Sequence, residues 1–577
     1  MKSRERTYLL DRLWELQHLR GYLIDEDVAQ AAKEFDLSPV DVQGVVGFYH
    51  FYHSNPTGKY TIYLNNSIVS WFNGFDEVKT AIKNETGAVL GGVDASGTYG
   101  FFETSCIGLS DREPAALINF QPFTGLTPQK VKRIIKELNT GKTPEELADT
   151  VTEHVQYKPE NNKAILLREF ETGKALEQLS KYTPDQVVAM IKESGLSGRG
   201  GAFFPTGMKW EFASKATGKP KYIVCNADEG EPGTFKDRAL INLLPGLMIE
   251  GMIVAGYAVG ASEGIIYLRA EYNWLLPKLN IALEEYQEKG YLGKKIKILG
   301  DYEFNIRVQM GAGAYICGEE TALLESLEGK RGEPRLKNVF PTDKGFLGKP
   351  TVINNVETFC AAARIVELGA EKFKSIGTPN STGTKLLSIA GDCKKPGIYE
   401  IEWGMSLGAL LELCGAENAN YVQMSGPSGE LLSADEKDRV ISLEDIRCGG
   451  SVMIFNTERD LFTILQNFLQ FFTYESCGLC TPCRAGNPQL LHMVERMMKG
   501  LAAPGDMEKA LQWSAIVKHS SRCGLGQTSP NALEQAIQKF PELFKEKLAP
   551  DNKYNREFSL EKATEAYNVL THGKGEE

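Results

Sequence analysis

The sequence predicts a protein of several α/β domains, and three observations support this fold class. Its 577 residues, 42% of them hydrophobic and 24% charged, are enough for several domains with sizeable cores. From residue 222 to 299, strand-like and helix-like segments alternate, which favours a parallel sheet. Beyond residue 457 the apolar residues recur at helical spacing. We therefore expect α/β units followed by a helical C-terminal domain.

The composition and the charge exclude several classes of protein. A net charge of −11 argues against a nucleic-acid-binding protein, which needs clustered Lys and Arg. The most apolar run, residues 243–260, contains Pro245 and Glu250 and is short for a bilayer span, so we expect a buried helix and no membrane insertion. The first residues are charged and do not resemble a secretory signal. The 11 cysteines, an odd number, favour a reducing compartment, so we expect a cytoplasmic protein.

Residues 1–145 predict a helical segment and then a small α/β domain. Leucines between Leu9 and Leu19 recur at helical spacing, and Ser38 with Asp41 forms a capping pair. The elements expected next are a strand at 59–64, a helix at 76–83, strands at 100–103 and 116–120, and a helix at 128–138. This order is thioredoxin-like. A polar stretch from residue 140 to 173 separates this domain from the next.

A glycine-rich segment at residues 195–210 is the first candidate for a phosphate-binding loop. Gly198 and Gly200 leave backbone amides open to phosphate oxygens, and Arg199 and Lys209 can balance the phosphate charge. A glycine-rich segment alone can equally be a simple turn. The segments that follow strengthen the binding hypothesis.

The next candidate is the loop 226–238, which follows a strand expected at 222–225. Ligands of open α/β sheets bind beyond the carboxyl ends of strands, and this is such an end. The loop offers polar groups that could bind ribityl, ring or ribose groups: Asn226, Asp228, Glu229 and Glu231. The alternative is a solvated acidic loop paired with Lys236 and Arg238.

A second glycine-rich turn, residues 311–323, opens a helix. The flat ring of Tyr315 beside Gly318 could lie along a cofactor ring. Asn354 and Asn355 offer amide donors and acceptors together, which suits the edge of an isoalloxazine ring, although a pair of asparagines is more often a turn.

The remaining segments complete the expected domains. Between the two glycine-rich turns we expect a helix at 243–259, a strand at 264–269, a helix at 274–288 and a strand at 295–299. A small α/β insert follows, with strands at 385–390 and 397–402 and a helix at 407–414. The last helices are expected at 461–474, 488–498, 507–517 and 532–540. The domain boundaries we expect are 1–145, 170–380, 381–456 and 457–545, with a peripheral tail at 546–577.

Four cysteines of the last domain predict a metal centre. Cys477, Cys480 and Cys483 are three residues apart, and Cys523 returns from elsewhere. In a [4Fe–4S] cluster each sulfur binds a different iron, which suits three ligands on one turn and one distant ligand. Zinc usually takes two separated Cys-x-x-Cys pairs, and the second pair is missing here. The sequence therefore favours an iron–sulfur cluster over a zinc site or free core thiols.

These five motifs, in this order and spacing, resemble the NADH-binding flavoprotein subunit of respiratory complex I over residues 170–540. The same module serves NAD-linked hydrogenases and formate dehydrogenases. The resemblance implies a Rossmann-like FMN and NADH domain, a β-grasp (SLBB) insert and a helical bundle with the [4Fe–4S] cluster. Flavin accepts a hydride and releases electrons singly, which links NADH to a one-electron cluster. Two residues depart from the family pattern: Ser197 stands where Arg is usual, and Phe203 where Gly is usual.

The resemblance also implies the ligand contacts. FMN would be held by Gly198, Arg199, Gly200, Lys209, Asn226, Asp228, Glu229, Tyr315, Gly318, Glu319, Asn354 and Asn355. The adenine of NADH would stack among Phe204, Phe212 and Phe340, with Glu231, Glu320 and Lys337 near the ribose and the nicotinamide. Hydride transfer needs no general base, so Glu231 and Glu320 would act by orientation and charge. A carboxylate near the adenine ribose repels a 2′-phosphate, which favours NAD over NADP.

The N-terminal domain resembles the thioredoxin-like small subunit of complex I, which binds a [2Fe–2S] cluster through four cysteines. Here those positions are Asn65, Ser70, Cys106 and Ser110, so only one ligand remains and we expect no cluster. Fusion of such a domain to the flavoprotein module resembles the diaphorase (alpha) subunit of NAD-reducing [NiFe] hydrogenases. The implied partners are a ferredoxin-like iron–sulfur subunit and the hydrogenase small and large subunits. Alternatives are a formate dehydrogenase or another complex I-like assembly, and, in a different class, a colourless structural zinc protein.

Overall fold

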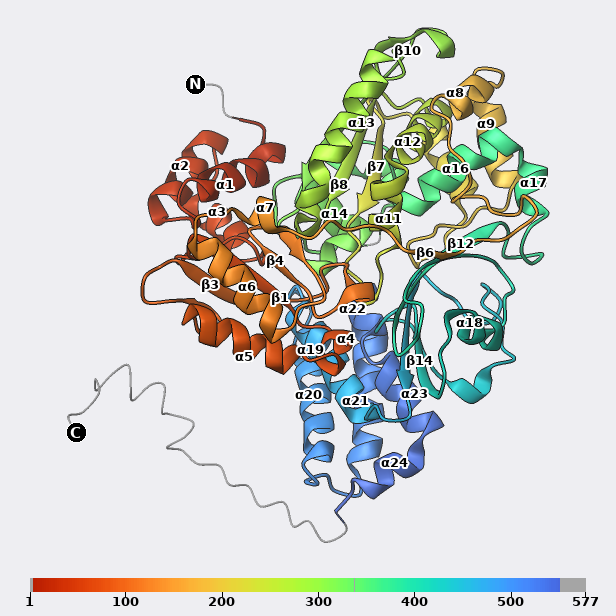
Figure 1. The fold of residues 1–577 in the computed structure, drawn as a ribbon. Coiled ribbons are helices and arrows are strands. Elements are labelled where there is room, and N and C mark those ends of the chain that lie inside the picture. The colour runs from red at the N-terminus through yellow and green to blue at the C-terminus, as the bar shows by residue number, and fades with distance from the viewer. Residues whose placement is uncertain (1–3, 337, 550–577) are drawn as a thin grey trace.

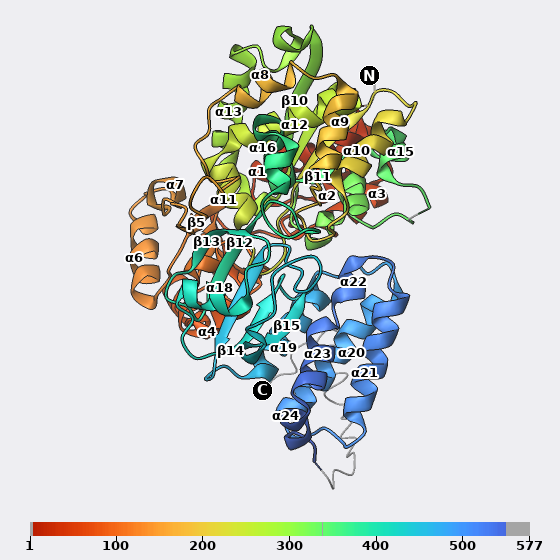
Figure 2. The same cartoon turned by 90° about the vertical axis from the view of Figure 1, so that its right-hand side faces the viewer.

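The computed structural model describes residues 4–336 and 338–549, which build three sheets and a group of C-terminal helices (Figure 1). The N-terminal part of the chain and the central α/β part lie side by side. The third sheet and the C-terminal helices lie below the central part in Figure 1, as they do in the turned view (Figure 2), and residues 461–474 of the C-terminal group also contact residues 68–72 of the N-terminal part.

The N-terminal part begins with three helices, which precede a five-stranded sheet in the order β2-β3-β1-β4-β5. The helices are α1 (Leu9–His18), α2 (Asp25–Phe35) and α3 (Pro39–Val46). The strands are β1 (Tyr60–Asn65), β2 (Gly92–Val93), β3 (Tyr99–Thr104), β4 (Ala116–Ile118) and β5 (Gln121–Phe123). The helices α4 (Ile68–Phe72), α5 (Phe75–Thr86) and α6 (Pro128–Asn139) complete it, with α5 against α6. The expected cap is confirmed, because Ser38 Oγ accepts a hydrogen bond from the Asp41 amide.

The central sheet has the order β11-β7-β8-β10-β9 and carries the glycine-rich segments. Its strands are β7 (Tyr222–Ala227), β8 (Glu263–Leu268), β9 (Gly293–Ile296), β10 (Tyr302–Met310) and β11 (Thr351–Asn355). β7 pairs in parallel with both β8 and β11, and β10 pairs in parallel with β8. The expected parallel sheet is therefore confirmed.

One expected strand of this sheet is wrong. We expected residues 295–299 to form a parallel strand after helix α13 (Leu276–Glu288), and they do not. β9 ends at Ile296 and is antiparallel, and Lys297–Leu299 form a 3-10 turn. The parallel strand is the longer β10, whose exposed and buried residues alternate irregularly and gave no clear sequence pattern.

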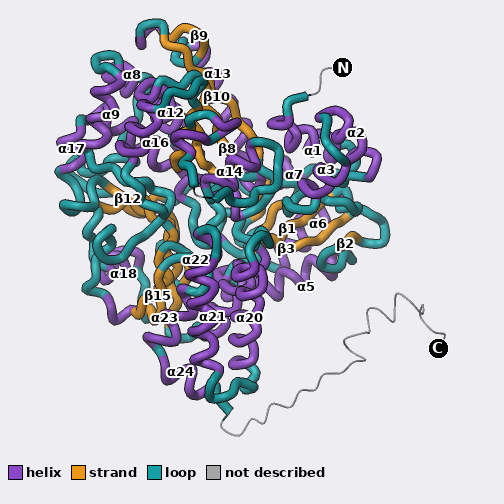
Figure 3. The backbone as a smooth tube through the Cα atoms, turned by 180° about the vertical axis from the view of Figure 1, so that it is seen from behind, coloured by secondary structure: helices purple, strands orange, loops and turns teal. Residues whose placement is uncertain are grey.

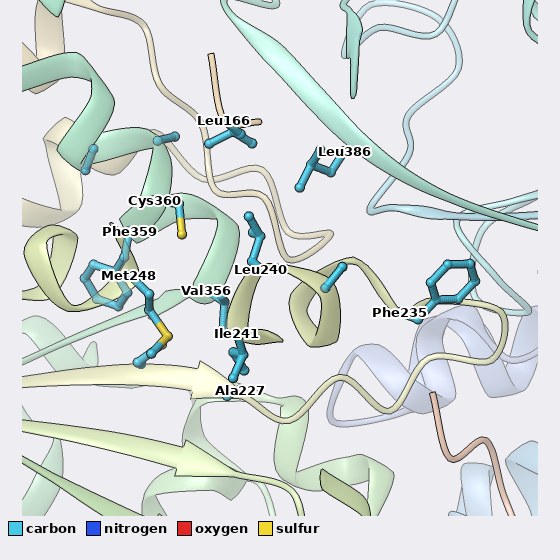
Figure 4. Close-up of a cluster of buried hydrophobic side chains, with 14 of the residues drawn as sticks. Leu166, Ala227, Phe235, Leu240, Ile241, Met248, Val356, Phe359, Cys360 and Leu386 are labelled. Carbon is cyan, nitrogen blue, oxygen red and sulfur yellow. The ribbon is translucent and has the colours of Figure 1, made fainter. Parts of the chain in front are cut away.

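The helices around the central sheet pack together through apolar side chains. They are α8 (Lys174–Leu179), α9 (Pro184–Glu193), α10 (Thr206–Lys215), α11 (Lys236–Leu243), α12 (Pro245–Val259), α14 (Glu320–Leu327) and α16 (Val356–Leu368). α12 packs against α16, and their side chains share a core with Ala227 at the end of β7 (Figure 4). Each large buried side chain contributes about 1.5–3 kcal/mol, so this core fixes the strand ends that carry the loops.

The expected buried helix at 243–259 is confirmed as α12, and its one carboxylate has partners. Glu250 accepts hydrogen bonds from the backbone amides of Gly173 (2.5 Å) and Ala175 (3.1 Å) at the start of α8. No single described helix is long and apolar enough to cross a bilayer. Helices α11 and α12 together have the length and apolar composition of a span, but a bend of 98° separates them.

The third sheet has the order β15-β14-β16-β12-β13-β6. Figure 3 shows its strands β12 and β15 from behind, with residues 407–414 beside the sheet. Its strands are β6 (Val155–Tyr157), β12 (Thr384–Gly391), β13 (Gly397–Glu402), β14 (Ala419–Met424), β15 (Glu430–Ser433) and β16 (Ser451–Asn456), and α18 (Leu407–Cys414) belongs to the same unit. β6 comes from the polar stretch expected to separate two domains, so that stretch extends the third sheet.

The C-terminal helices are α19 (Leu461–Tyr474), α20 (Thr481–Met498), α21 (Asp506–Ser520), α22 (Gly524–Thr528), α23 (Asn531–Lys539) and α24 (Pro541–Glu546). α20 begins seven residues before the expected start at 488, because Pro488 lies inside the helix. α19, α20 and α21 pack in sequence along their lengths (Figure 1). Most of the expected tail, residues 550–577, lies outside the described residues.

Candidate functional site

A cavity of about 670 Å³ lies at the carboxyl ends of β7 and β11, a size that fits a bound cofactor. Its wall includes nine of the predicted residues: Gly200, Asn226, Asp228, Glu229, Glu231, Tyr315, Gly318, Glu319 and Asn355. The third sheet contributes Ser425 and Ser428, and α22 contributes Gly524, Leu525 and Thr528. Three parts of the chain therefore enclose one site.

Of the Asn-Asn pair, Asn355 lines the cavity and Asn354 does not. The pair ends β11, where Asn354 lies beside Cys225 and Asn355 beside Asn226 of β7. The alternative of a simple turn is wrong. The Asn354 Oδ1 atom accepts a hydrogen bond from Trp210 Nε1 (2.9 Å), so that side chain also fixes helix α10.

The loop 226–238 is buried, so the alternative of a solvated acidic loop is wrong. Glu229 is 6% exposed, and Lys236 and Arg238 are 2% and 0% exposed. Glu229 accepts hydrogen bonds from the amides of Asp237 (2.8 Å) and Arg238 (3.0 Å), which caps helix α11. The Asn226 amide donates to the Gly318 carbonyl (2.8 Å), which joins this loop to the second glycine-rich turn.

Glu231 and Tyr315 form one unit of the cavity wall. The Tyr315 hydroxyl donates to Glu231 (2.5 Å), and the Ser428 amide donates to the other carboxylate oxygen (2.9 Å). Burial raises the pKa of Glu231. A Cβ on Gly230 would lie 2.9 Å from the Tyr315 ring, so only glycine allows this ring to pack against the loop.

Asp228 lines the cavity with a buried oxygen atom, Oδ2, that lacks a hydrogen-bond donor among the described residues. Burial raises the pKa of Asp228 well above its ordinary value. A polar ligand in the cavity could satisfy this oxygen, since an unpaired buried polar atom costs about 1–3 kcal/mol.

A cluster of buried charges lies behind the Asn355 side chain. Glu357 contacts Lys385 Nζ at 2.5 Å and Lys236 Nζ at 3.1 Å. Lys236 Nζ also donates to Asn355 Oδ1 (3.2 Å), and Asn355 donates in turn to Asp237 (2.5 Å). The sequence reasoning missed Lys236 and Asp237 as parts of the site, although the density of charged residues within 229–238 was an available signal. Lys385, which lies behind them, had no such signal.

The basic residues of the first glycine-rich segment take two different positions. Lys209 Nζ donates to the Ile353 carbonyl (3.0 Å) and to Glu320 (3.2 Å), beside the second turn. Arg199 is fully buried, and its guanidinium donates to the Thr382 carbonyl (2.8 Å) and to Ser197 Oγ (3.4 Å). The structure thus turns the Arg199 side chain away from the cavity; burial lowers its pKa to about 10.

The two departures from the family pattern both affect this segment. Phe203 lines the cavity with φ of 55°, in the left-handed region that favours glycine. Its ring packs against the core of the third sheet, which holds it there. Ser197 is buried and accepts the Arg199 hydrogen bond.

The predicted adenine-binding aromatic residues lie outside the cavity and are exposed to solvent. Phe204, Phe212 and Phe340 are 42%, 50% and 68% exposed. Helix α10, which carries Phe212, packs against α15 (Pro341–Lys344), which follows Phe340 directly. Lys337 lies outside the described residues.

The four predicted cysteines lie beside the same cavity. Cys480 and Cys523 are the N-cap residues of α20 and α22. Cys483 and Cys523 are 6% and 5% exposed; burial, with the neighbouring thiols, raises the pKa of Cys483 to about 12 and of Cys523 to about 11. A Cβ on Gly526 would lie 3.1 Å from Cys483 Cβ, so glycine brings the two turns together.

The donor set fits an iron–sulfur cluster. Cys477, Cys480 and Cys523 all lie near enough to Cys483 to raise its pKa, and Cys523 is followed at once by the helix α22 that lines the cavity. In residues 4–336 and 338–549, no three His, Cys, Asp or Glu side chains are placed to hold one metal ion. A [4Fe–4S] cluster does not need its ligands around a single ion, because each of its four sulfur ligands binds a different iron.

Glu475 is a site residue to which the sequence pattern assigned no role. It is 5% exposed and lies two residues before Cys477. Its carboxylate accepts hydrogen bonds from the Tyr315 amide (2.9 Å) and from Ser105 Oγ (2.6 Å), and lies 3.8 Å from His50 Nε2. It therefore joins the cysteine turn to the cavity wall and to the N-terminal part.

Comparisons with known proteins agree with this geometry. Residues 191–364 match the model of the Nuo51 FMN-binding domain, and residues 1–139 match the thioredoxin-like [2Fe–2S] ferredoxin. Residues 463–547 match the NADH-ubiquinone oxidoreductase-F iron–sulfur binding region.

Similar chains are found among hydrogenases and respiratory enzymes. The chain is 47% identical over 556 residues to the alpha subunit of the NAD-reducing hydrogenase HoxS of Cupriavidus necator, covering 94% of this chain and 92% of that one. It is 42% identical over 373 residues to an NADH-quinone oxidoreductase chain of Aquifex aeolicus, covering 64% and 87%. A crystal structure of NAD⁺-reducing [NiFe]-hydrogenase in the H₂-reduced state contains a chain with a TM-score of 0.90 and 34% identity, covering 99% and 98%.

The fold and the site define an oxidoreductase subunit that combines a flavin site with an iron–sulfur site. The chain belongs to the family of alpha subunits of NAD-reducing hydrogenases. The predicted FMN and [4Fe–4S] cofactors are confirmed by the matching family models. The absence of a [2Fe–2S] cluster from the N-terminal domain stays a prediction.

Proposed function

We propose that this chain exchanges a hydride between NAD(H) and FMN and passes single electrons through its [4Fe–4S] cluster to or from hydrogenase subunits. The observation that carries the proposal is the shared wall: α22 begins directly after Cys523 and lines the flavin cavity. Electron transfer needs the two cofactors close together, and one helix turn joins their sites.

FMN would be held by the residues that line the cavity. Asn226 and Asp228 present polar groups from the end of β7, and Asn355 does so from the end of β11. Gly200, Gly201 and Lys236 also line the cavity and would contact the phosphate. When bound, FMN supplies the conversion between hydride and single-electron chemistry. The side chains orient it and exclude water.

NADH would lie across the open side of the cavity. The exposed rings of Phe204, Phe212 and Phe340 offer faces for the adenine, and exposed aromatic residues of this kind mark binding surfaces. The carboxylates of Glu231 and Glu320 would orient the ribose and nicotinamide side. Glu231 is held by Tyr315 and Ser428, which supports a fixed orienting role and a preference for NAD.

The domains would follow the boundaries expected from the sequence. We assign residues 1–145 to the thioredoxin-like domain, 170–380 to the FMN and NADH domain, 381–456 to a β-grasp (SLBB) domain and 457–545 to a helical bundle. The order of the three sheets supports these divisions, with the addition of β6 to the third sheet. All 11 cysteines are free, which supports the cytoplasm as the location.

The N-terminal domain would hold no iron. At the family's ligand positions, Asn65 Nδ2 and Ser110 Oγ both donate hydrogen bonds to Glu113, which is 8% exposed. Only the Cys106 sulfur remains, and one thiolate cannot hold a binuclear cluster. About four irons per chain support this proposal, whereas about six contradict it.

The partners would be a ferredoxin-like iron–sulfur subunit and the hydrogenase small and large subunits. Purification of the native assembly with metal analysis tests this proposal. Nickel in stoichiometric amount supports it, whereas an assembly without nickel would contradict it.

A further inference from the structure

Residues 105–113 of the thioredoxin-like domain lie against the flavin loop 226–238. In the sequence this segment contains two of the family's iron-ligand positions, Cys106 and Ser110. In the structure it receives two buried arginines from the flavoprotein part, Arg238 and Arg269. The segment that binds iron in the family is therefore a contact between two domains in this chain.

Arg238 forms the first link between the thioredoxin-like domain and the flavoprotein part. Its side chain is fully buried and donates to Asp111 (3.1 Å), to Glu153 (2.6 Å) and to the Gly108 carbonyl (2.5 Å). The Asp111 side chain is also fully buried, so both charges are removed from water. Burial alone would raise the pKa of Asp111, but Arg238 and Arg112 hold it at about 2.

Arg269 forms the second link. Its guanidinium donates to the Cys106 carbonyl (2.6 Å), to the carbonyl of Glu229 and to Glu271 (2.6 Å). One side chain thus holds the backbone of the N-terminal segment against the backbone of the flavin loop.

The acceptors in the N-terminal segment are themselves fixed. Glu113 is buried and accepts hydrogen bonds from Asn65, Ser67 and Ser110. Polar groups that are fully hydrogen-bonded to one another in a low-dielectric interior make a rigid unit. The carbonyls of Cys106 and Gly108 therefore stand at defined positions for the two arginines.

The link continues from Arg238 to the cavity through Glu229. The Arg238 amide donates to Glu229 (3.0 Å), and Tyr272 donates to the same carboxylate (2.8 Å). Glu229 lines the cavity, and Glu231 follows two residues later. A shift of Arg238 would consequently move the loop that carries both carboxylates.

We propose that Asp111 and Glu153 are positioning residues for the flavin site, acting through Arg238 on the loop 226–238. The inference rests on the proposed function. The thioredoxin-like domain then serves as a structural support for hydride transfer. A residue that sets geometry at a distance can change a rate by up to about 100-fold, because reacting groups tolerate little displacement.

The test compares two variants of the full chain in its native assembly. Asp111→Asn removes the carboxylate charge beside fully buried Arg238. Glu367→Gln is the matched control, because Glu367 pairs with the equally buried Arg364 (2.6 Å) on α16 and touches neither the N-terminal segment nor the flavin loop in any described contact. The measurements are bound FMN per chain, the FMN dissociation constant, and kcat and KM for NADH with an artificial electron acceptor.

We expect Asp111→Asn to weaken FMN binding and to raise KM for NADH by about tenfold, and Glu367→Gln to change neither by more than about twofold. Asp111→Glu, which restores the charge, should recover part of the loss. The proposal is overturned if Asp111→Asn keeps the wild-type FMN affinity and KM. If Asp111→Asn does not fold, Glu153→Gln decides by the same criteria. A wild-type assembly without FMN would refute the proposed function itself, before any variant is compared.

Discussion

Replacing Glu357 by glutamine removes the only carboxylate that contacts both buried lysines beside the flavin cavity, among the described residues. Glu357 and Lys385 have no exposed side-chain surface, and Lys236 has 3%. The Glu357 carboxylate contacts Lys385 Nζ (2.5 Å), Lys236 Nζ (3.1 Å) and the Leu386 amide (3.0 Å). Burial alone would raise the pKa of Glu357, but Lys385, Lys236 and Arg199 keep it below its ordinary value.

The expected loss of stability is large because two buried charges lose a partner. Breaking a buried ion pair by removing one member costs about 3–5 kcal/mol. Lys236 keeps Asp237 at 2.6 Å, but Lys385 has no second carboxylate within its described ion pairs. We therefore expect the free energy of unfolding to fall by about 3–5 kcal/mol at pH 7.

The loss should shrink as the pH rises. Burial lowers the pKa of Lys385 from its ordinary 10.5 to about 8, a shift equivalent to about 3 kcal/mol of destabilisation when the amine is charged. Because the folded pKa lies below the unfolded one, this penalty is fully present below pH 8 and is relieved between pH 8 and 10.5. Without Glu357 the pKa of Lys385 in the folded protein falls further. The Glu357→Gln variant should therefore lose more unfolding free energy at about pH 7 than at about pH 9.

Urea unfolding followed by circular dichroism at about pH 7 and about pH 9 measures both effects. Glu400→Gln is the control, because this fully buried carboxylate binds the amides of Ile165 and Leu166 and the Thr384 hydroxyl, and no lysine in any described contact. The control should lose stability equally at both pH values. A Glu357→Gln variant with the same loss at both pH values, or with a loss below about 1 kcal/mol, would refute the reasoning.

Three further changes test the site itself. Cys523→Ser should lower the iron content from about four to near zero per chain, whereas Cys448→Ser, a buried thiol of the third sheet, should keep all four; equal iron in both variants would contradict the ligand assignment. Tyr315→Phe removes the hydrogen bond to Glu231 and should lower kcat/KM for NADH about tenfold, with unchanged values speaking against an orienting role. Glu231→Ala should gain activity with NADPH, and a variant that gains none would count against the assignment of Glu231 to the adenine ribose.

The sequence predicted the segments whose pattern is local. The helices α12, α18 and α19 and the strands β1, β7 and β13 lie within a few residues of their expected positions, because their apolar spacing is regular. The strand β10 was missed because its burial pattern is irregular, and a shorter apolar run at 295–299 took its place. The start of α20 was misplaced because Pro488 looked like a first-turn residue.

The sequence predicted the residues that line the cavity better than the residues that hold them in place. Motif order identified Asn226, Asp228 and Tyr315, whose groups meet at the cavity. Burial could not be predicted for the loop 226–238, because charged residues are usually exposed and these are paired through tertiary contacts. The roles of Arg199 and Glu475 likewise depend on segments that are far away in the sequence.

The measurement that tests the central claim most directly is the visible spectrum of the anaerobically purified chain during titration with NADH. The account predicts flavin bands together with a broad iron–sulfur shoulder, and both should bleach as NADH is added. A chain that retains iron but no flavin, and that fails to reduce a dye with NADH, would contradict it.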